Sequence, residues 1–364
     1  MLERLQANGF RNLHRLDWRP EPGPQILLGD NGAGKTSLLE AIYRLATTRS
    51  FRTHQISDCL SHSSSRFDLL GEVRSESRIR LETSLDDEGR RRRLNGSESS
   101  LAEHLAALPV VAWTARDGEL ISGPPEERRR FLDRGVVGIK PRGLEILGQY
   151  RRALAQKRHL LLRGMGGLES WNEILATSAA ALMEERQDYV NLIGAELSAV
   201  LEHSGLSFPG LKLEYRPSLG GDREPREILR RLRRLEGDER LRQRPLTGPH
   251  RDDLAISWKS HSLKRVASAG ERKAVGLALL GAHGRVLRAL GRRPVYLLDD
   301  VDTELSAATL EKVWKVFSGG GQLVASSNRP EVWRSLPVET FWLLREGALE
   351  GPSELSHKAP AEIP

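Results

Sequence analysis

Cysteine is nearly absent from this 364-residue sequence, which contains only Cys59. A single cysteine rules out a disulfide within the chain and fits a reducing compartment, so we expect a cytoplasmic protein. No apolar run approaches the length that crosses a bilayer, and the N-terminus has no signal-peptide core. A disulfide-stabilised secreted domain is thereby excluded, and we expect no membrane association.

Aromatic residues are also scarce, at 5% of the chain. Base stacking on aromatic rings is therefore a less favoured mode of nucleic-acid binding than contact with a duplex backbone. The chain has 56 Lys and Arg against 49 Asp and Glu, a net charge of +7. This balance modestly favours an anionic partner.

The most informative stretch is residues 29–37, which match the pattern G-x-x-x-x-G-K-[ST]. A strand-like apolar run precedes it at 25–28, and residues 38–45 after it have helical spacing, as a phosphate-binding loop requires. Backbone N–H groups of such a loop and the helix N-terminus surround phosphates. An incidental Gly-rich turn is the weaker explanation. The residues expected to contact a nucleoside triphosphate are Gly29, Asp30, Asn31, Gly32, Ala33, Gly34, Lys35, Thr36 and Ser37.

Two acidic residues are candidates for the rest of this site. Lys35 is placed to reach the β- and γ-phosphates, and the Thr36 hydroxyl to bind Mg²⁺. Asp299, directly after the apolar run 295–298, is the candidate metal ligand, and Asp300 is the candidate general base. Most of the chain separates the loop from these acids. The sequence therefore predicts a nucleotide site built from both chain ends around an inserted lobe.

Hydrophobic periodicity predicts an α/β fold, a mixed sheet with flanking antiparallel strands, plus an inserted helical lobe. Two strands joined by a turn at 10–12 are expected within 1–18, and further strands are expected at 67–74, 79–85, 91–94, 109–113, 294–298, 322–326 and 340–344. Helices are expected at 126–137, 144–162, 169–204 and 224–242, with an exposed loop at 236–240. The expected domains are a lobe of 1–115 with 245–350, a helical lobe of 116–244, and a tail of disordered composition at 351–364.

A second anion site is predicted at Ser268, Ala269, Gly270 and Glu271, which open a long apolar helix. The hydroxyl, the glycine and the helix N-terminus all favour negative charge there. The alternative is an ordinary serine N-cap with an acidic first turn. The position shortly before the acidic strand, in a protein whose nucleotide site is split, favours the anion site.

The order of these features resembles the ABC/SMC-type ATPase heads, and six stretches are similar to the RecF family of bacterial recombination-repair ATPases. The stretches are 10–12 (Phe-Arg-Asn), 31–43, 49–53 (Arg-Ser-Phe-Arg-Thr), 127–133, 248–254 (Gly-Pro-His-Arg-Asp-Asp-Leu) and 297–305. They extend over nearly the whole chain. The resemblance implies an ABC-type P-loop ATPase head with a helical insertion, and it adds Arg11 and Asn12 to the nucleotide site.

The resemblance also implies a mechanism and partners. RecF proteins form ATP-dependent dimers, so Ser268, Gly270 and Glu271 would act in trans on a nucleotide that Lys35 of the other protomer holds. ATP would close a clamp on DNA, and slow Mg²⁺-dependent hydrolysis would release it. The family acts at single-strand gaps and junctions, where RecR and RecO help it to promote RecA loading.

Several positions depart from the family pattern. Ala267 replaces the usual Gly before the signature serine, Glu271 the usual Gln, and Ser306 the usual Asp. Residues 113–117 also differ, and Ser-Ser-Asn at 326–328 contains no switch histidine. None of these changes removes a phosphate or metal ligand, but they leave dimer affinity, turnover and the residue that senses the γ-phosphate open.

Contacts to DNA phosphates leave no unique motif. The candidate DNA-contacting residues are Arg49, Arg52, Arg128, Arg129 and Lys140. For each one the alternative is a solvated or ion-paired side chain. The arginine run 90–93, beside a hairpin signal at 95–96, is interpreted as a charged edge strand rather than a DNA-contacting ridge.

Three other functions remain as alternatives. The ATP-binding subunit of a membrane transporter is disfavoured by the RecF-like stretches. An SMC-like DNA-bridging head needs long coiled-coil arms, and no sustained heptads run through 144–204. A module that has lost hydrolysis is the third, because Asp300 stands where ABC heads usually have Glu.

Overall fold

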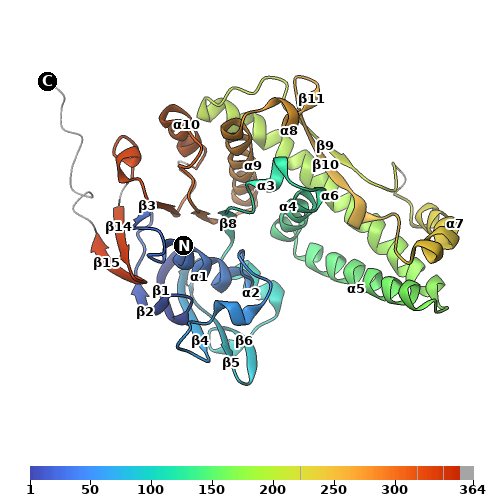
Figure 1. The fold of residues 1–364 in the computed structure, drawn as a ribbon, viewed down its shortest axis with the longest axis horizontal. Helices are drawn as coiled ribbons and strands as arrows, with labels where there is room; N and C mark the ends of the chain where they lie inside the picture. The colour runs from blue at the N-terminus through green and yellow to red at the C-terminus, as the bar shows by residue number, and fades with distance from the viewer. Residues whose placement is uncertain (222, 318, 339, 353–364) are drawn as a thin grey trace. The chain divides into compact units, whose positions relative to one another are not determined.

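The computed structural model describes residues 1–221, 223–317, 319–338 and 340–352 (Figure 1). The chain forms two compact units, which are described separately. The first contains residues 1–118, 200–206 and the chain from Ala269 onward, and the second contains 119–199 and 207–268. Within the described ranges, no helix combines the length and apolar character that a membrane span needs.

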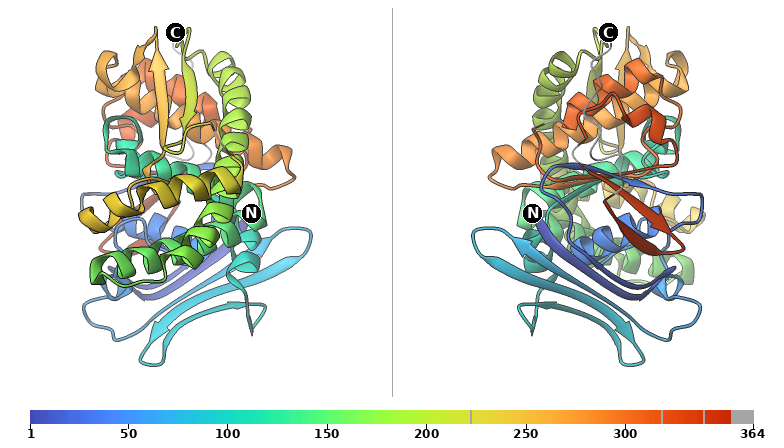
Figure 2. Two further views of the ribbon diagram at one scale, coloured as in Figure 1. Left: turned by 90° about the vertical axis from the view of Figure 1, so that its right-hand side faces the viewer. Right: turned by 90° about the vertical axis from the view of Figure 1, so that its left-hand side faces the viewer.

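The first unit contains an antiparallel six-stranded sheet of order β2-β1-β4-β5-β6-β7, whose hairpins can be followed in both views of Figure 2. In β4 every second residue is buried, so one sheet face packs on the core. The predicted strands of this sheet are confirmed. Their bounds are β1 Leu2–Phe10, β2 Leu13–Trp18, β4 Phe67–Arg74, β5 Arg78–Asp86 and β6 Gly89–Leu94, and the short β7 Ser97–Glu98 was not predicted.

A second six-stranded sheet in this unit has the order β15-β14-β3-β13-β12-β8. All its pairs are parallel except β14 with β15, which confirms the mixed sheet. All four residues of β12 are buried, as expected for a parallel strand covered on both faces. The bounds are β3 Pro24–Leu28, β8 Val110–Trp113, β12 Val295–Leu298, β13 Leu323–Ser327, β14 Thr340–Arg345 and β15 Ala348–Pro352.

Helix α1, Lys35–Thr47, contacts strands of both sheets, and its apolar side chains join one hydrophobic core with theirs. Because β3 lies between β13 and β14, the first and last parts of the chain share one sheet. The other helical segments of the unit are η1 Ile56–Cys59, α2 Leu101–Ala107, α9 Ala269–Ala289, α10 Ala307–Phe317 and η3 Pro330–Trp333.

The second unit is mainly helical, as predicted, and adds a three-stranded antiparallel sheet of order β11-β10-β9. Helix α6 begins in this unit, and its last residues belong to the first. The bounds are α3 Glu119–Ser122, α4 Pro125–Ile139, α5 Pro141–Arg163, α6 Leu168–Ser204, α7 Pro225–Arg242, η2 Pro249–Arg251, α8 Leu263–Val266, β9 Lys212–Arg216, β10 Asp253–Trp258 and β11 His261–Ser262.

Three sequence expectations differ from the structure. Residues 245–268 join the helical unit rather than the first lobe, because β10 pairs with β9 from Asp253↔Arg216 onward. Residues 236–240 continue α7 rather than forming a loop, since the ion pair Glu236–Arg240 has helical spacing and stabilises this turn. In the predicted tail, residues 351–352 belong to β15, and 353–364 lie outside the described residues.

Candidate nucleotide site

The loop between β3 and α1 is shaped by glycines. Gly29 has φ +151°, and a Cβ there would lie 2.4 Å from the carbonyl oxygen of Leu344. Gly34, at the start of α1, has φ +112°. Both conformations strain residues that have a side chain, so the loop depends on glycine at these positions. The first N–H groups of α1 have no acceptor within the helix, so they are available to an anion at the place where the motif predicts a phosphate.

Lys35 and Thr36 begin α1. The Lys35 ammonium donates to the carbonyl oxygens of Gly29 (2.6 Å) and Asp30 (3.0 Å), so it lies across the loop. The Thr36 hydroxyl donates to the Asp299 carboxylate at 3.0 Å. The structure therefore brings together the two residues that the sequence assigns to Mg²⁺.

Asp299 lies at the end of β12, where it also accepts a hydrogen bond of 2.7 Å from the hydroxyl of Ser326. Burial raises the pKa of Asp299, and the nearby charge of Asp300 acts in the same direction, while the two hydroxyl donors oppose it. A hydroxyl beside a partly buried carboxylate is a set of hard oxygen ligands that fits Mg²⁺. A bound divalent cation would favour the ionised form of this carboxyl.

Asp300 is exposed and has φ +46°, a left-handed conformation that is uncommon for residues other than glycine. Its backbone N–H donates to the hydroxyl of Ser326 at 2.9 Å, so Ser326 contacts both acids. The sequence interpretation did not assign Ser326 to the site. Its signal was its place near the end of β13, because parallel neighbouring strands end at the same sheet edge.

Arg11 and Asn12 lie in the turn between β1 and β2. The Asn12 amide donates to the carbonyl oxygen of Gly32 at 3.0 Å, so this turn contacts the phosphate loop. Arg11 makes a two-pronged contact of 2.9 and 2.8 Å with Glu40, a fully buried residue of α1. Glu40 was not predicted from sequence. The geometry gives Asn12 a place beside the loop, and gives Arg11 a role in holding the turn to α1.

The predicted signature residues 268–271 lie at the start of α9. A Cβ on Gly270 would lie 2.9 Å from the carbonyl oxygen of Glu304, so glycine allows α9 to approach the segment after the acids. One turn later, the Lys273 ammonium donates to the carbonyl oxygens of Asp300 (3.0 Å) and Thr303 (2.8 Å) and to the Thr303 hydroxyl (2.8 Å). Burial lowers the pKa of Lys273, and nearby acids oppose this shift. Lys273 thus joins the signature helix to the acidic segment.

Two of the DNA candidates are engaged inside the second unit. Arg128 makes contacts of 2.6 and 3.1 Å with the carboxylate of Asp253. Arg129 donates to the carbonyl oxygen of Asp252 at 2.9 Å. Both arginines therefore join α4 to the RecF-like stretch 248–254.

The other three DNA candidates differ in whether their side chains have an internal partner. Lys140 pairs with Glu185 (2.7 Å) and Asp188 (3.4 Å), and Arg52 lies 3.4 Å from the buried glutamate of α1. Arg49 is exposed, and only its backbone groups have hydrogen bonds within the described residues. Most of the candidate cations therefore already have an internal partner.

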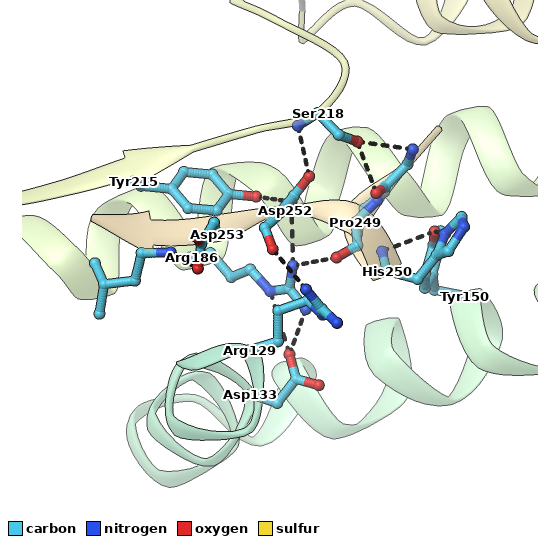
Figure 3. Close-up of polar contacts among 12 residues, drawn as sticks. Arg129, Asp133, Tyr150, Arg186, Tyr215, Ser218, Pro249, His250, Asp252 and Asp253 are labelled. Carbon is cyan, nitrogen blue, oxygen red and sulfur yellow. Dashed lines mark hydrogen bonds and ion pairs between the residues drawn. The ribbon is translucent and has the colours of Figure 1, made fainter. Parts of the chain in front are cut away.

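Figure 3 shows the polar contacts that the stretch 248–254 makes around Asp252. Buried Asp252 accepts hydrogen bonds from the Tyr215 hydroxyl, the Ser218 N–H (2.8 Å) and the guanidinium of Arg186 (3.1 Å). Arg186 also contacts Asp133 of α4 at 2.7 Å. Because the network satisfies a buried carboxylate from three sides, it fixes the arrangement of α4, α6 and the small sheet.

Comparison with known proteins agrees with this architecture. Residues 1–335 match the family model described as RecF/RecN/SMC N terminal domain. The RecF protein of Acidothermus cellulolyticus is 34% identical, covering 95% of this chain and 98% of its own length. That of Chlorobium phaeovibrioides is 32% identical, covering 90% and 93%. Both are described as DNA replication and repair proteins.

Solved structures show the same relationship. One described as the recombination mediator protein RecF-ATPrS in the RecFOR pathway has a TM-score of 0.87 at 25% identity, covering 96% of this chain and 97% of that one. An SMC head bound to a winged-helix domain of ScpA, at 16% identity and a TM-score of 0.57, shares the fold. The chain is an ABC/SMC-type ATPase head, and it belongs to the RecF family of DNA replication and repair proteins.

Proposed function

We propose that this protein is an ATP-driven clamp that binds DNA during recombinational repair and replication-fork maintenance. The observation that carries the proposal is the contact between Thr36 of the phosphate loop and Asp299 of the acidic strand. It completes one nucleotide site from residues at opposite ends of the chain. The solved RecF relatives, described with ATP or ATPrS, support ATP as the nucleotide.

The roles proposed for the site follow from its chemistry. Lys35 and the loop N–H groups hold the phosphates, and Thr36 and Asp299 hold Mg²⁺. When bound, Mg²⁺ neutralises phosphate charge. Asp300, held by Ser326 and Lys273, orients the attacking water as general base. Hydrolysis is slow and DNA-stimulated, because the nucleotide acts as a switch between two states.

The switch is an ATP-dependent homodimer. In this proposal Ser268, Ala269, Gly270 and Glu271 of one protomer contact the γ-phosphate held by the other. The opening of α9 suits this role, because a helix N-terminus attracts anions. ATP then favours the closed dimer, and hydrolysis releases DNA.

The proposed DNA is a duplex with a single-strand gap or junction. The RecFOR pathway named for the solved relatives supports RecR and RecO as partners, with RecA loading as the outcome. We place the protein in the cytoplasm.

Sedimentation of the protein with Mg-ATP, with and without a gapped duplex, tests the proposal. ATP is expected to drive dimerisation and DNA retention in wild type, and Lys35→Ala and Ser268→Ala are expected to abolish both. Lys264→Ala, an exposed lysine of α8, is the matched control and should behave as wild type. A wild-type protein that stays monomeric and ignores DNA with every nucleotide would contradict the proposal.

A further inference from the structure

The positive charge of this chain is concentrated in two helices of the second unit. Helix α5 has six Lys or Arg against one acid, and α7 has seven against four, so together they carry +8. The whole chain carries +7. The remainder of the protein is therefore close to neutral, and the basic character of the sequence comes from these two helices.

The two helices pack against each other. The ammonium of Lys157 in α5 lies 2.6 Å from the carboxylate of Glu239 in α7, and both side chains are fully buried. Leu154 of α5 and Ile228 and Leu232 of α7 line one small pocket. The arginines on the outer sides of α5 and α7 therefore belong to one continuous part of the unit.

Eight arginines on this part are exposed and have no side-chain hydrogen bond or ion pair within the described chain. They are Arg142, Arg152, Arg158 and Arg163 in α5, Arg226, Arg234 and Arg242 in α7, and Arg244 just after it. We call them the free arginines. They differ from most of the DNA candidates chosen from sequence, which are held by internal carboxylates or carbonyls.

Three other arginines of α7 are neutralised by neighbours. Arg230 pairs with Glu227, Arg233 with Glu169 and Arg240 with Glu236. Both kinds of arginine are exposed on α7, but only the guanidinium groups of the paired arginines already contact a carboxylate. An external anion would preferentially contact the free ones, because the paired ones must first give up their partner.

We propose that the free arginines of α5 and α7 bind the phosphate backbone of duplex DNA. The inference rests on the proposed function and adds the surface by which the helical unit holds DNA. At 1.5 Å per residue, the 23 residues of α5 and 18 of α7 extend over about 34 and 27 Å. An extended array of guanidinium groups is complementary to duplex DNA, a rod with one negative charge per ~1.7 Å of axis. Such phosphate contacts do not depend on the base sequence.

An acidic protein is the other partner that such charge could take. Exposed apolar residues accompany the arginines at one end only, where Leu162, Met165 and Leu241 are 62%, 51% and 84% exposed. The free arginines instead extend from the start of α5 to its last residue, and from Arg226 to beyond the end of α7. A contact spread along both helices favours the duplex, because protein interfaces concentrate binding energy in a compact patch.

The test compares two triple variants of α7 that remove equal charge. The first is Arg226→Gln, Arg234→Gln, Arg242→Gln, which removes free arginines. The matched control is Arg230→Gln, Arg233→Gln, Arg240→Gln, which removes paired ones. Affinity for a labelled gapped duplex is measured with Mg-ATP over a range of salt concentrations. Thermal unfolding and ATP-dependent dimerisation are measured for each variant to show that fold and switch are intact.

The free-arginine variant is expected to bind more weakly and to make the slope of log K against log salt shallower by about 3, because about one counterion is released per phosphate contact. The control is expected to keep a slope close to wild type. Equal salt slopes in both variants would overturn the proposal. Unchanged DNA binding in both variants would also overturn it and would favour an acidic protein as the partner of this surface. A wild-type protein that does not bind DNA refutes the proposed function itself.

Discussion

The hydroxyl of Thr36 donates a hydrogen bond of 3.0 Å to the carboxylate of Asp299, although 263 positions separate the two residues in sequence. Thr36 belongs to the first turn of α1, and Asp299 directly follows β12. Strand β13 lies between β12 and β3, so the sheet order places the acidic residue beside the phosphate loop. The proposed nucleotide site therefore depends on the pairing of strands from both chain ends.

Replacement of Thr36 tests this contact. Thr36→Ala removes the hydroxyl, so Mg²⁺-dependent hydrolysis should fall about 100-fold, since a poorly held metal stabilises developing charge less. Thr36→Ser keeps the hydroxyl and should retain most activity. The rate of phosphate release at several Mg²⁺ concentrations measures both. Equal activity of the alanine and serine variants would show that Thr36 does not hold the metal.

Lys273 should act as a positioning residue for Asp300. Lys273→Met removes the ammonium that contacts the carbonyl oxygens of Asp300 and Thr303, and the Asp300 oxygen keeps only the Thr303 hydroxyl and N–H as donors. The acidic segment should therefore shift and kcat fall about tenfold. KM for ATP should stay near wild type, because the phosphate loop is untouched. Steady-state ATPase kinetics separate the two constants. A rise in KM with unchanged kcat would assign Lys273 to nucleotide binding instead.

The buried ion pair of Lys157 and Glu239 should be costly to break from one side. The two atoms are 2.6 Å apart but poorly aligned for a hydrogen bond, so the attraction is mainly Coulombic. Lys157→Met should destabilise the protein by about 3–5 kcal/mol, because Glu239 is left as an unpaired buried charge. Adding Glu239→Gln should recover most of this loss, since an amide oxygen can still accept from the Leu246 N–H. Denaturant unfolding checks both, and an unrecovered double variant contradicts the explanation.

His250 should make the fold sensitive to acid. Burial, with the positive charges of Arg158 and Arg251, lowers its pKa to about 3, so the native imidazole stays neutral beside the Tyr150 hydroxyl at 2.6 Å. The unfolded chain takes up a proton below about pH 6.5, so stability is complete above that pH and is lost as pH falls toward 3. The loss should be about 2 kcal/mol at pH 5.

The control for this prediction is His250→Gln, which offers the Tyr150 hydroxyl an acceptor that does not titrate. Unfolding free energies of wild type and variant are compared between pH 7 and pH 5. The difference in unfolding free energy between wild type and His250→Gln should become smaller as pH falls, because only wild type loses the contribution of the neutral imidazole. A constant difference over this range would show that another group causes the acid sensitivity.

Local patterns in the sequence predicted much of the fold and the phosphate-binding loop of the site. The β4 alternation and the glycines of residues 29–37 act over a few residues, so the strand and the loop could be predicted without tertiary information. The continuation of α7 through 236–240 could not. A Gly-Asp-Glu sequence indicates a loop locally, and it is helical here because Glu239 is buried against Lys157 of another helix.

The sequence by itself determined the chemistry of the protein: a phosphate-binding loop, two acids after an apolar strand, and an excess of arginine. Only the tertiary structure decided which groups meet. In the folded chain Thr36 contacts Asp299, and Ser326 and Lys273 contact the acidic segment. Arg128 and most other DNA candidates contact internal carboxylates or carbonyl groups. The reason is physical, since a motif fixes residue types at short spacing, whereas partners distant in sequence meet only through packing of the whole chain.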